Sequence, residues 1–188
     1  MGRDQIVGAA ARLFAARPYE RVSIRDIGEE AGLTNPALYA HFKGKEALGL
    51  AVYERAYARL VEAVEAAVLP DMTPREKVAA YVRAAVGLLG DEGAPMRIVE
   101  RQLALFGPRV REAWGDRAIT VRLAGWIAAG RADGSIRADH DPAFLIAAII
   151  GPVTAFIIQE EAGLAPAEGA ADALAALVDA AIAPETAR

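Results

Sequence analysis

Hydrophobic residues recur every three or four positions at the start of the chain, and glycine and proline divide this pattern into short segments. The spacing predicts a first helix over residues 3–16, which ends before Pro18 because the residue preceding a proline avoids the helical region. Ser23 is a favourable N-cap for a second helix, which Gly32 ends in the usual C-terminal manner. The next segment then begins after a turn of only two residues.

That segment, LTNPALYAHFKGK at 33–45, predicts a third helix with two different faces. Leu38 and Phe42 lie four positions apart, so they share a face that can pack on the first two helices. Asn35 and Tyr39 lie on another face, among small residues. Two helices joined by a tight turn containing glycine form a helix-turn-helix, whose second helix enters the major groove of DNA.

The exposed face of the third helix carries groups that suit DNA. The amide of Asn35 can bond a base edge, with adenine as the best-matched base. Tyr39 and His41 can donate hydrogen bonds to phosphates, and Lys45 adds positive charge beside a helix N-terminus. The simpler alternatives are a core aromatic at Tyr39 and an ordinary surface histidine at His41.

The rest of the chain is also helical by its pattern. Thr73 to Glu76 forms a capping box with proline at the first helical position. The helix from Asp141 is apolar nearly all round, so we expect it to be buried on several sides, with a kink at Gly151-Pro152. The predicted ranges are 45–69, 73–89, 95–107, 108–130, 141–162 and 167–182, with a break at Gly115 in the fourth as an alternative.

Composition favours an all-α fold, because alanine supplies much of the 54% hydrophobic content and is the strongest helix former. The chain has no cysteine and two histidines, too few ligands for a metal cluster, and no cofactor is expected. The longest mostly apolar run, 142–158, has 17 residues and is interrupted by Gly-Pro, which favours a buried soluble helix over a membrane span. The N-terminus lacks a signal pattern, so a cytoplasmic location is expected.

Charge is unevenly distributed along the chain, whose net charge is −4. The first 48 residues carry seven basic and six acidic side chains, or +1, and the remainder carry 14 and 19, or −5. The first 48 residues are therefore relatively basic. The difference is mild, and solvated surfaces explain it as readily as a DNA-binding surface does.

The first 50 residues resemble the DNA-binding domain of the TetR (tetracycline repressor) family in the order and spacing of their motifs. These motifs are SIRDI at 23–27, AGLT at 31–34, NPALY at 35–39, LYAHFK at 38–43 and KEAL at 45–48. The resemblance implies an all-α homodimeric regulator with a C-terminal ligand-binding domain. Two residues depart from the family pattern: Pro18 stands for a glycine, and Gly28 for an alanine, which weakens the second helix by up to about 1 kcal/mol.

The resemblance also implies which residues meet DNA. Those at positions that often contact it are Ser23, Arg25, Thr34, Asn35, Tyr39, His41 and Lys45, and Pro36 and Ala37 match positions near the bases. For Arg25, an ion pair with Glu29 within the domain is an equal alternative. The expected domains are a helix-turn-helix DNA-binding domain at 1–48 and a helical-bundle domain for ligand binding and dimerisation at 49–188.

The C-terminal part is expected to hold an effector pocket and a dimer interface. Large residues chosen by size and location are candidates for the pocket wall: Tyr81, Phe106, Trp114, Trp126 and Phe156. Ile150 and Ile157 represent the apolar helix expected to pair with a second copy. The stretch 97–102 is interpreted mainly as a solvated helix face, with one arginine directed to an anionic effector as the minority alternative.

The sequence therefore predicts a ligand-responsive regulator of transcription that binds double-stranded DNA at a pseudo-palindromic operator. A repressor released by a small apolar effector is the simplest form, and activation is left open. A helical-bundle enzyme is disfavoured, because the chain lacks a nucleophilic triad, a phosphate loop and a metal-ligand set. A third alternative, an interaction module that keeps the fold without binding DNA, is disfavoured by the polar groups and lysines around the third helix.

Overall fold

Nine α-helices and two short 3₁₀ turns form the regular structure of residues 2–90, 95–164 and 168–184, the part of the chain that the computed structural model describes. The helices are α1 (Arg3–Ala16), α2 (Ile24–Ala31), α3 (Asn35–His41), α4 (Lys45–Ala67), α5 (Pro74–Gly87), α6 (Pro95–Trp114), α7 (Ile119–Ala132), α8 (Pro142–Glu161) and α9 (Ala170–Ile182). The 3₁₀ turns are η1 (Tyr19–Arg21) and η2 (Gly115–Arg117). The predicted all-α fold class is confirmed.

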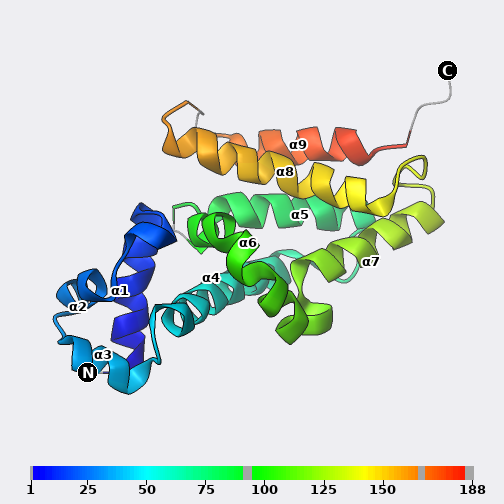
Figure 1. Cartoon of the computed structure of the whole chain (residues 1–188). Coiled ribbons are helices and arrows are strands. Elements are labelled where there is room, and N and C mark those ends of the chain that lie inside the picture. The colour runs from blue at the N-terminus through cyan, green and yellow to red at the C-terminus, as the bar shows by residue number, and fades with distance from the viewer. Residues whose placement is uncertain (1, 91–94, 165–167, 185–188) are drawn as a thin grey trace.

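The arrangement has two regions, which share a core. In Figure 1, α1–α3 form a group at one end, and α8 and α9 lie along the edge of a body made with α4–α7. Buried hydrophobic residues from all nine described helices form one continuous cluster, and α1 packs on both α4 and α6. The N-terminal helices are therefore in direct contact with the helical body.

The turn between α2 and α3 depends on two glycines. The Ser23 hydroxyl accepts a hydrogen bond from the Asp26 N–H, which is half of the capping box that starts α2. Gly32 ends α2 with a φ of +66°, a left-handed conformation that glycine adopts without strain. The sequence predicts only a weakened helix from Gly28, but a Cβ there would lie 2.9 Å from the carbonyl oxygen of Leu33. Glycine is required because the turn approaches α2 closely.

The predicted end of a helix at Gly107 is wrong, because α6 continues through Pro108 without interruption. A proline removes one backbone hydrogen bond, here to the carbonyl of Ala104, an exposed residue that water can reach. Phe106 and Val110, on either side of the proline, are 0% and 1% exposed. Their burial holds both halves of α6 against the same core, and this packing outweighs the local preference for a break.

Only one side of α8 is buried within a single copy of the chain, so one copy alone does not cover this helix on several sides. Leu145, Ile149, Val153 and Ile157 face the core and are at most 2% exposed. The helix continues through Pro152 and is long and apolar enough by composition to cross a membrane, yet only 22% of its apolar stretch is buried within the protomer. The apolar character of α8 therefore exceeds what a single copy of the chain covers.

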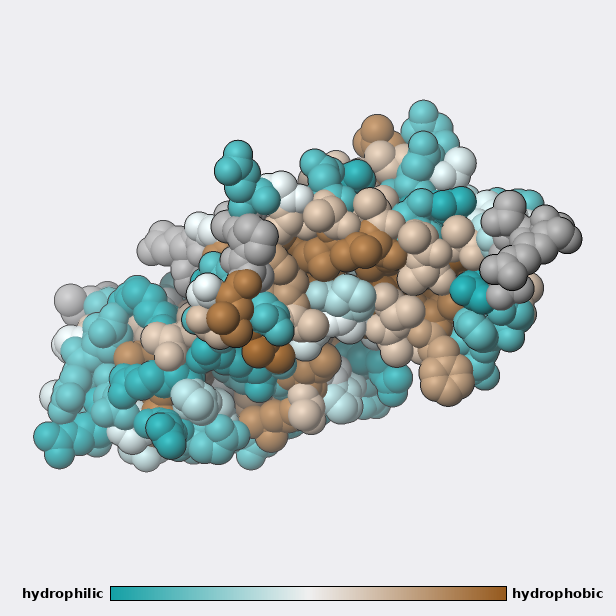
Figure 2. Space-filling model, turned by 90° about the horizontal axis from the view of Figure 1, so that it is seen from above, coloured by the Kyte–Doolittle hydropathy of each residue, from teal (hydrophilic) through white to brown (hydrophobic). Residues whose placement is uncertain are grey.

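An exposed apolar surface follows from this geometry, and we name it the α8–α9 face. It contains large exposed side chains, Phe144, Ile158 and Leu177, together with the small exposed residues Ala147, Gly151, Ala155 and Ala173. Figure 2 views the molecule from the side of α8 and α9, and apolar residues gather in a band along the body. Ile157, predicted at the dimer interface, is in the protomer core instead. The predicted start of the last helix at 167 lies outside the described residues.

Candidate DNA-binding face and effector cavity

The third helix, α3, is anchored on one side and exposed on the other. Leu38 and Phe42 are 2% and 6% exposed and belong to the buried cluster, as their spacing predicts. Tyr39 lies on the opposite side and is 56% exposed, so it is not a core aromatic. The exposed candidates for DNA contact are Ser23, Arg25, Thr34, Asn35, Pro36, Tyr39 and His41, whereas Ala37 and Lys45 are half-buried.

Two of these candidates also have partners inside the domain. The Nε of Arg25 lies 2.9 Å from a carboxylate oxygen of Glu29, the alternative that its spacing left open. An exposed pair of this kind contributes little to stability, so a phosphate can compete for the guanidinium. The hydroxyl of Ser23 is engaged in the capping box of α2.

Lys45 is held in place at the start of α4. Its Nζ lies 4.2 Å above the ring of Tyr19 and donates a hydrogen bond of 3.4 Å to the carbonyl oxygen of Glu20. Burial lowers the pKa of the Lys45 amine, and the charges of Glu20 and Asp26 oppose that effect. The amine therefore sits beside the N-terminus of a long helix, where a phosphate is also favoured.

A cavity of about 350 Å³ lies between α4, α5, α6, α7 and α8. Its wall is mostly apolar and includes three tyrosines, Tyr53, Tyr57 and Tyr81. Glu100 and Arg111, of opposite charge, line it as well. A mostly apolar cavity of this size with a few polar groups is typical of a small-molecule site between bundle helices.

The cavity wall overlaps only partly with the predicted one. Tyr81 lies in the wall. Phe106 and Trp114 stand behind it, because the ring of Phe106 is 5.9 Å from that of Tyr53, and the ring of Trp114 is 5.5 Å from that of Tyr57. The half-buried residues Trp126 and Phe156 are not among the lining residues.

Sequence reasoning missed the two tyrosines of α4 as lining residues of the cavity. Tyr53 and Tyr57 lie one turn apart in α4, which is rich in alanine. Their spacing was the available signal, since residues four apart share a helix face. Ile150, predicted at the dimer interface, lines the cavity.

The tyrosine hydroxyls of α4 differ in their partners. The Tyr57 hydroxyl accepts a hydrogen bond of 2.8 Å from the backbone N–H of Ile119, at the start of α7. The Tyr53 hydroxyl is buried and has no partner among the described residues. Burial raises the pKa of both phenols, and for Glu100 burial followed by the charge of Glu161 raises the pKa of the carboxyl group.

A row of aromatic rings connects the cavity with the N-terminal helices. From Tyr53 in the wall, the row passes to Phe106 of α6 at 5.9 Å, to Tyr19 of η1 at 5.6 Å and to Phe14 of α1 at 5.2 Å, measured between ring centroids. Gly49 allows this approach, because a Cβ there would lie 2.6 Å from Tyr19 Cε2 and 2.9 Å from Phe106 Cζ. The aromatic contacts thus run from the cavity wall to Tyr19, the residue on which Lys45 rests.

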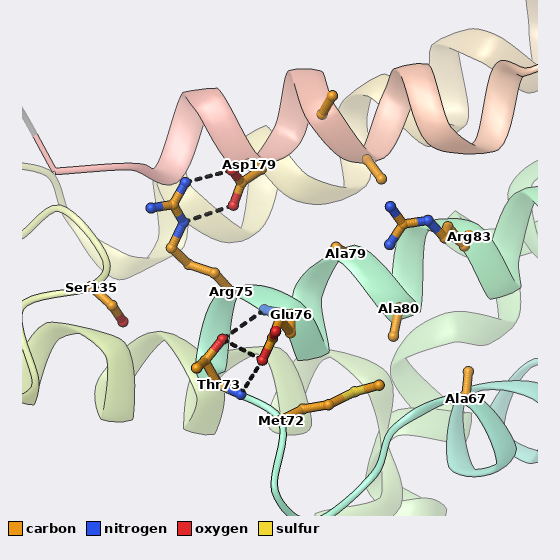
Figure 3. Close-up of a pocket in the computed structure, with 12 residues that line it drawn as sticks. Ala67, Met72, Thr73, Arg75, Glu76, Ala79, Ala80, Arg83, Ser135 and Asp179 are labelled. Carbon is orange, nitrogen blue, oxygen red and sulfur yellow. Dashed lines mark hydrogen bonds and ion pairs between the residues drawn. The ribbon is translucent and has the colours of Figure 1, made fainter.

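A second, more open groove lies between α5 and α9, and Figure 3 shows its residues. Arg75 reaches across it to form an ion pair with Asp179, and Arg83 pairs with Asp172. These side chains tie α5 to α9. The guanidinium groups in this groove are thus occupied by carboxylates of the protein itself.

The stretch 97–102 differs from the solvated face predicted for it. Arg97 pairs with Glu160 and Glu161 of α8, and Arg101 pairs with Glu161. These side chains are 22–27% exposed, so they form a partly buried network between α6 and α8.

Among the described residues, no group of three or more His, Cys, Asp or Glu side chains could hold a metal ion.

Comparison with known proteins gives a consistent result. Residues 6–52 match the family described as bacterial regulatory proteins, tetR family. The HTH-type transcriptional activator FasR of Mycolicibacterium smegmatis is 31% identical over 108 residues, which cover 57% of this chain and 49% of FasR. The chain therefore spans about half the length of that relative. The HTH-type transcriptional repressor KstR2 of Rhodococcus jostii is 28% identical over 151 residues, covering 74% of this chain and 70% of KstR2.

Solved structures share the fold over the whole length. The crystal structure of the transcriptional regulator FadR from Bacillus subtilis in complex with stearoyl-CoA has a TM-score of 0.74. It covers 96% of this chain and 100% of that one at 19% sequence identity. At this level of sequence identity, the similarity shows a shared fold and nothing about the ligand.

Proposed function

We propose, because the chain belongs to the TetR family of bacterial regulatory proteins, that it is a ligand-responsive DNA-binding regulator of transcription. The observation that carries this proposal is the placement of α3, which buries Leu38 and Phe42 and turns Tyr39 outward within the matched region. We further propose that it is a repressor, released from its operator by a small apolar effector, and that it acts in the cytoplasm by binding and not by catalysis.

For DNA contact, we propose that α3 enters the major groove. Asn35 would read a base edge, with Pro36 and Ala37 close to the bases. Tyr39 and His41 would contact phosphates. Four residues near the ends of the helix-turn-helix would do the same: Ser23, Arg25, Thr34 and Lys45. The exposure of most of these side chains supports the proposal. The DNA-binding domain would comprise residues 1–48, and ligand binding and dimerisation would lie in 49–188.

We propose that the α8–α9 face joins two copies of the chain. Its large side chains include Phe144 and Leu177, which are 73% and 65% exposed in one protomer. Small exposed residues of α8, such as Gly151, allow another helix to approach closely. An exposed apolar surface of this kind marks an interaction site, and a second copy would cover the same face on both subunits. Two DNA-binding domains would then meet two half-sites of a pseudo-palindrome.

For the response to ligand, we propose that the effector occupies the cavity and shifts α4 and α6. Phe106 lies between Tyr53 of the cavity wall and Tyr19 of the N-terminal region, so movement of α6 would be passed to the residue beneath Lys45. Only a ligand that prefers the non-binding arrangement can weaken DNA binding. The coupling must be reciprocal, so operator DNA would weaken effector binding by the same factor.

An electrophoretic mobility shift with fragments of the source genome tests DNA binding. We expect retarded complexes at low salt that Tyr39→Phe weakens for all sequences alike. A reporter fused to a bound fragment then separates repression from activation, because deletion of the regulator raises expression in the first case and lowers it in the second. If no fragment is retarded at low salt, in the presence or absence of cell extract, the proposed function is wrong.

A further inference from the structure

Tyr53 contributes to the cavity wall with a hydroxyl that has no hydrogen-bond partner among the described residues. The side chain is 0% exposed, so bulk water does not solvate it. Leaving a buried hydroxyl unpaired costs stability, and buried polar groups in proteins nearly always have a partner. An unpaired hydroxyl at the wall of an apolar cavity is accounted for when a bound molecule supplies the partner.

The Tyr53 hydroxyl lies near two residues of α6 that line the cavity, Leu103 and Gly107. A Cβ added to Gly107 of α6 would lie 3.5 Å from the Tyr53 hydroxyl oxygen and 2.8 Å from Leu103 Cδ1, so the end of the flexible Leu103 side chain fills the space beside this glycine and must shift for a ligand to reach the hydroxyl. Gly107 also lines the cavity. The stacked neighbour Tyr57 differs, because its hydroxyl already accepts the hydrogen bond from Ile119.

The protonation state of Tyr53 defines what it can bind. Burial, with a smaller contribution from Tyr57, raises the pKa of the Tyr53 phenol far above its usual value. The hydroxyl is therefore neutral at physiological pH and can both donate and accept a hydrogen bond. Glu100 and Arg111 bring opposite charges to the wall, so the cavity has no net charge with which to select an ion.

We propose that the effector is a predominantly apolar, uncharged molecule carrying a hydroxyl or carbonyl oxygen, and that this oxygen pairs with the Tyr53 hydroxyl. This inference rests on the proposed function and names the chemical class of its effector. The apolar wall takes up the hydrocarbon part, because burial of apolar surface drives binding. The Tyr53 hydroxyl fixes orientation, and a molecule without the oxygen leaves that group unpaired.

The test compares two probes, 2-nonanone and nonane, on wild-type protein and on Tyr53→Phe. Dissociation constants come from the rise in melting temperature with probe concentration. We expect the variant to bind 2-nonanone about five- to tenfold more weakly, while its affinity for nonane changes by less than about twofold. The free probes differ in hydration, but that difference is the same for both proteins. The loss of affinity for 2-nonanone on Tyr53→Phe, divided by the loss of affinity for nonane, therefore isolates the hydrogen bond.

Infrared spectra of 2-nonanone labelled with ¹³C at the carbonyl give a second readout that a purely structural role would not move. We expect the carbonyl stretch of the bound ketone at a lower frequency in wild-type protein than in Tyr53→Phe, because a hydrogen bond weakens the C=O bond. Binding of nonane shows that the variant keeps a folded cavity. The proposal is overturned if wild type binds neither probe, if both probes lose affinity equally, or if the carbonyl frequency is unchanged. DNA binding, measured separately, would stand in all three cases.

Discussion

Replacing Gly49 with alanine tests the contact between the cavity wall and the N-terminal region. The new Cβ would lie 2.6 Å from Tyr19 Cε2 and 2.9 Å from Phe106 Cζ, whereas carbon atoms pack at about 3.5–4.0 Å. One ring must therefore move by about 1 Å. Overpacking of this kind costs about 1–3 kcal/mol, and the better helix propensity of alanine returns up to about 1 kcal/mol. We expect the free energy of unfolding to fall by about 1–2 kcal/mol.

Gly125→Ala is the matched control for this variant. Gly125 lies within α7, and a Cβ there meets nothing within 4 Å, so the same chemical change adds only helix propensity. We expect its free energy of unfolding to rise by about 0.5–1 kcal/mol. Urea unfolding followed by circular dichroism, at one protein concentration for all variants, measures both changes.

The effect of Gly49→Ala on DNA binding is the second half of this prediction. Displacement of Tyr19 disturbs the ring on which Lys45 rests, so operator affinity should fall in Gly49→Ala and stay at the wild-type value in Gly125→Ala. Equal stability of the two variants would refute the tight contact. A destabilised Gly49→Ala with wild-type affinity for DNA would refute the proposed route from the cavity to the N-terminal helices.

Three further predictions concern the DNA-binding face, the dimer and the effect of pH. Asn35→Ala should relax base preference at one operator position by about 1–3 kcal/mol, and Tyr39→Phe should weaken binding to all operator sequences alike. Binding titrations on a set of single-base operator variants measure both effects. Ile158→Asp should give monomers by light scattering and lose operator binding, because its side chain is 53% exposed on the α8–α9 face; a dimer of wild-type stability would exclude that face. The hydrogen bond from the Thr73 backbone N–H lowers the pKa of Glu76, so its contribution to stability is complete above the unfolded pKa of about 4.3 and is lost as pH falls below it. Glu76→Gln should therefore flatten the loss of melting temperature between about pH 5 and 3, and an unchanged slope would contradict this.

Sequence reasoning succeeded where the determining interactions are local. Ser23, Gly32 and Thr73 act within one helical turn, so caps and boundaries could be predicted from neighbouring residues. The third helix could also be divided into a buried and an exposed face, because Leu38 and Tyr39 differ in a short amphipathic pattern.

Sequence reasoning failed where distant segments decide the outcome. Pro108 lies inside α6 because the buried side chains around it pack against other helices. In α8 nearly every position is apolar, so no periodicity distinguishes the buried Ile157 from the exposed Ile158. The cavity brings together residues of five helices, among them Tyr53 and Tyr81, and no sequence spacing specifies that convergence.

Selection of genomic DNA fragments on the purified protein, followed by fluorescence anisotropy on the enriched fragment, tests the central claim most directly. We expect enrichment of one pseudo-palindromic motif, binding of two protomers per site, and affinity that falls steeply with salt as counterions are released. Lys45→Ala should bind the same fragment more weakly and reduce the slope of log affinity against log salt by about 1. Failure of the wild-type protein to enrich any fragment over bulk genomic DNA at low salt would contradict the claim that this chain regulates transcription by binding DNA.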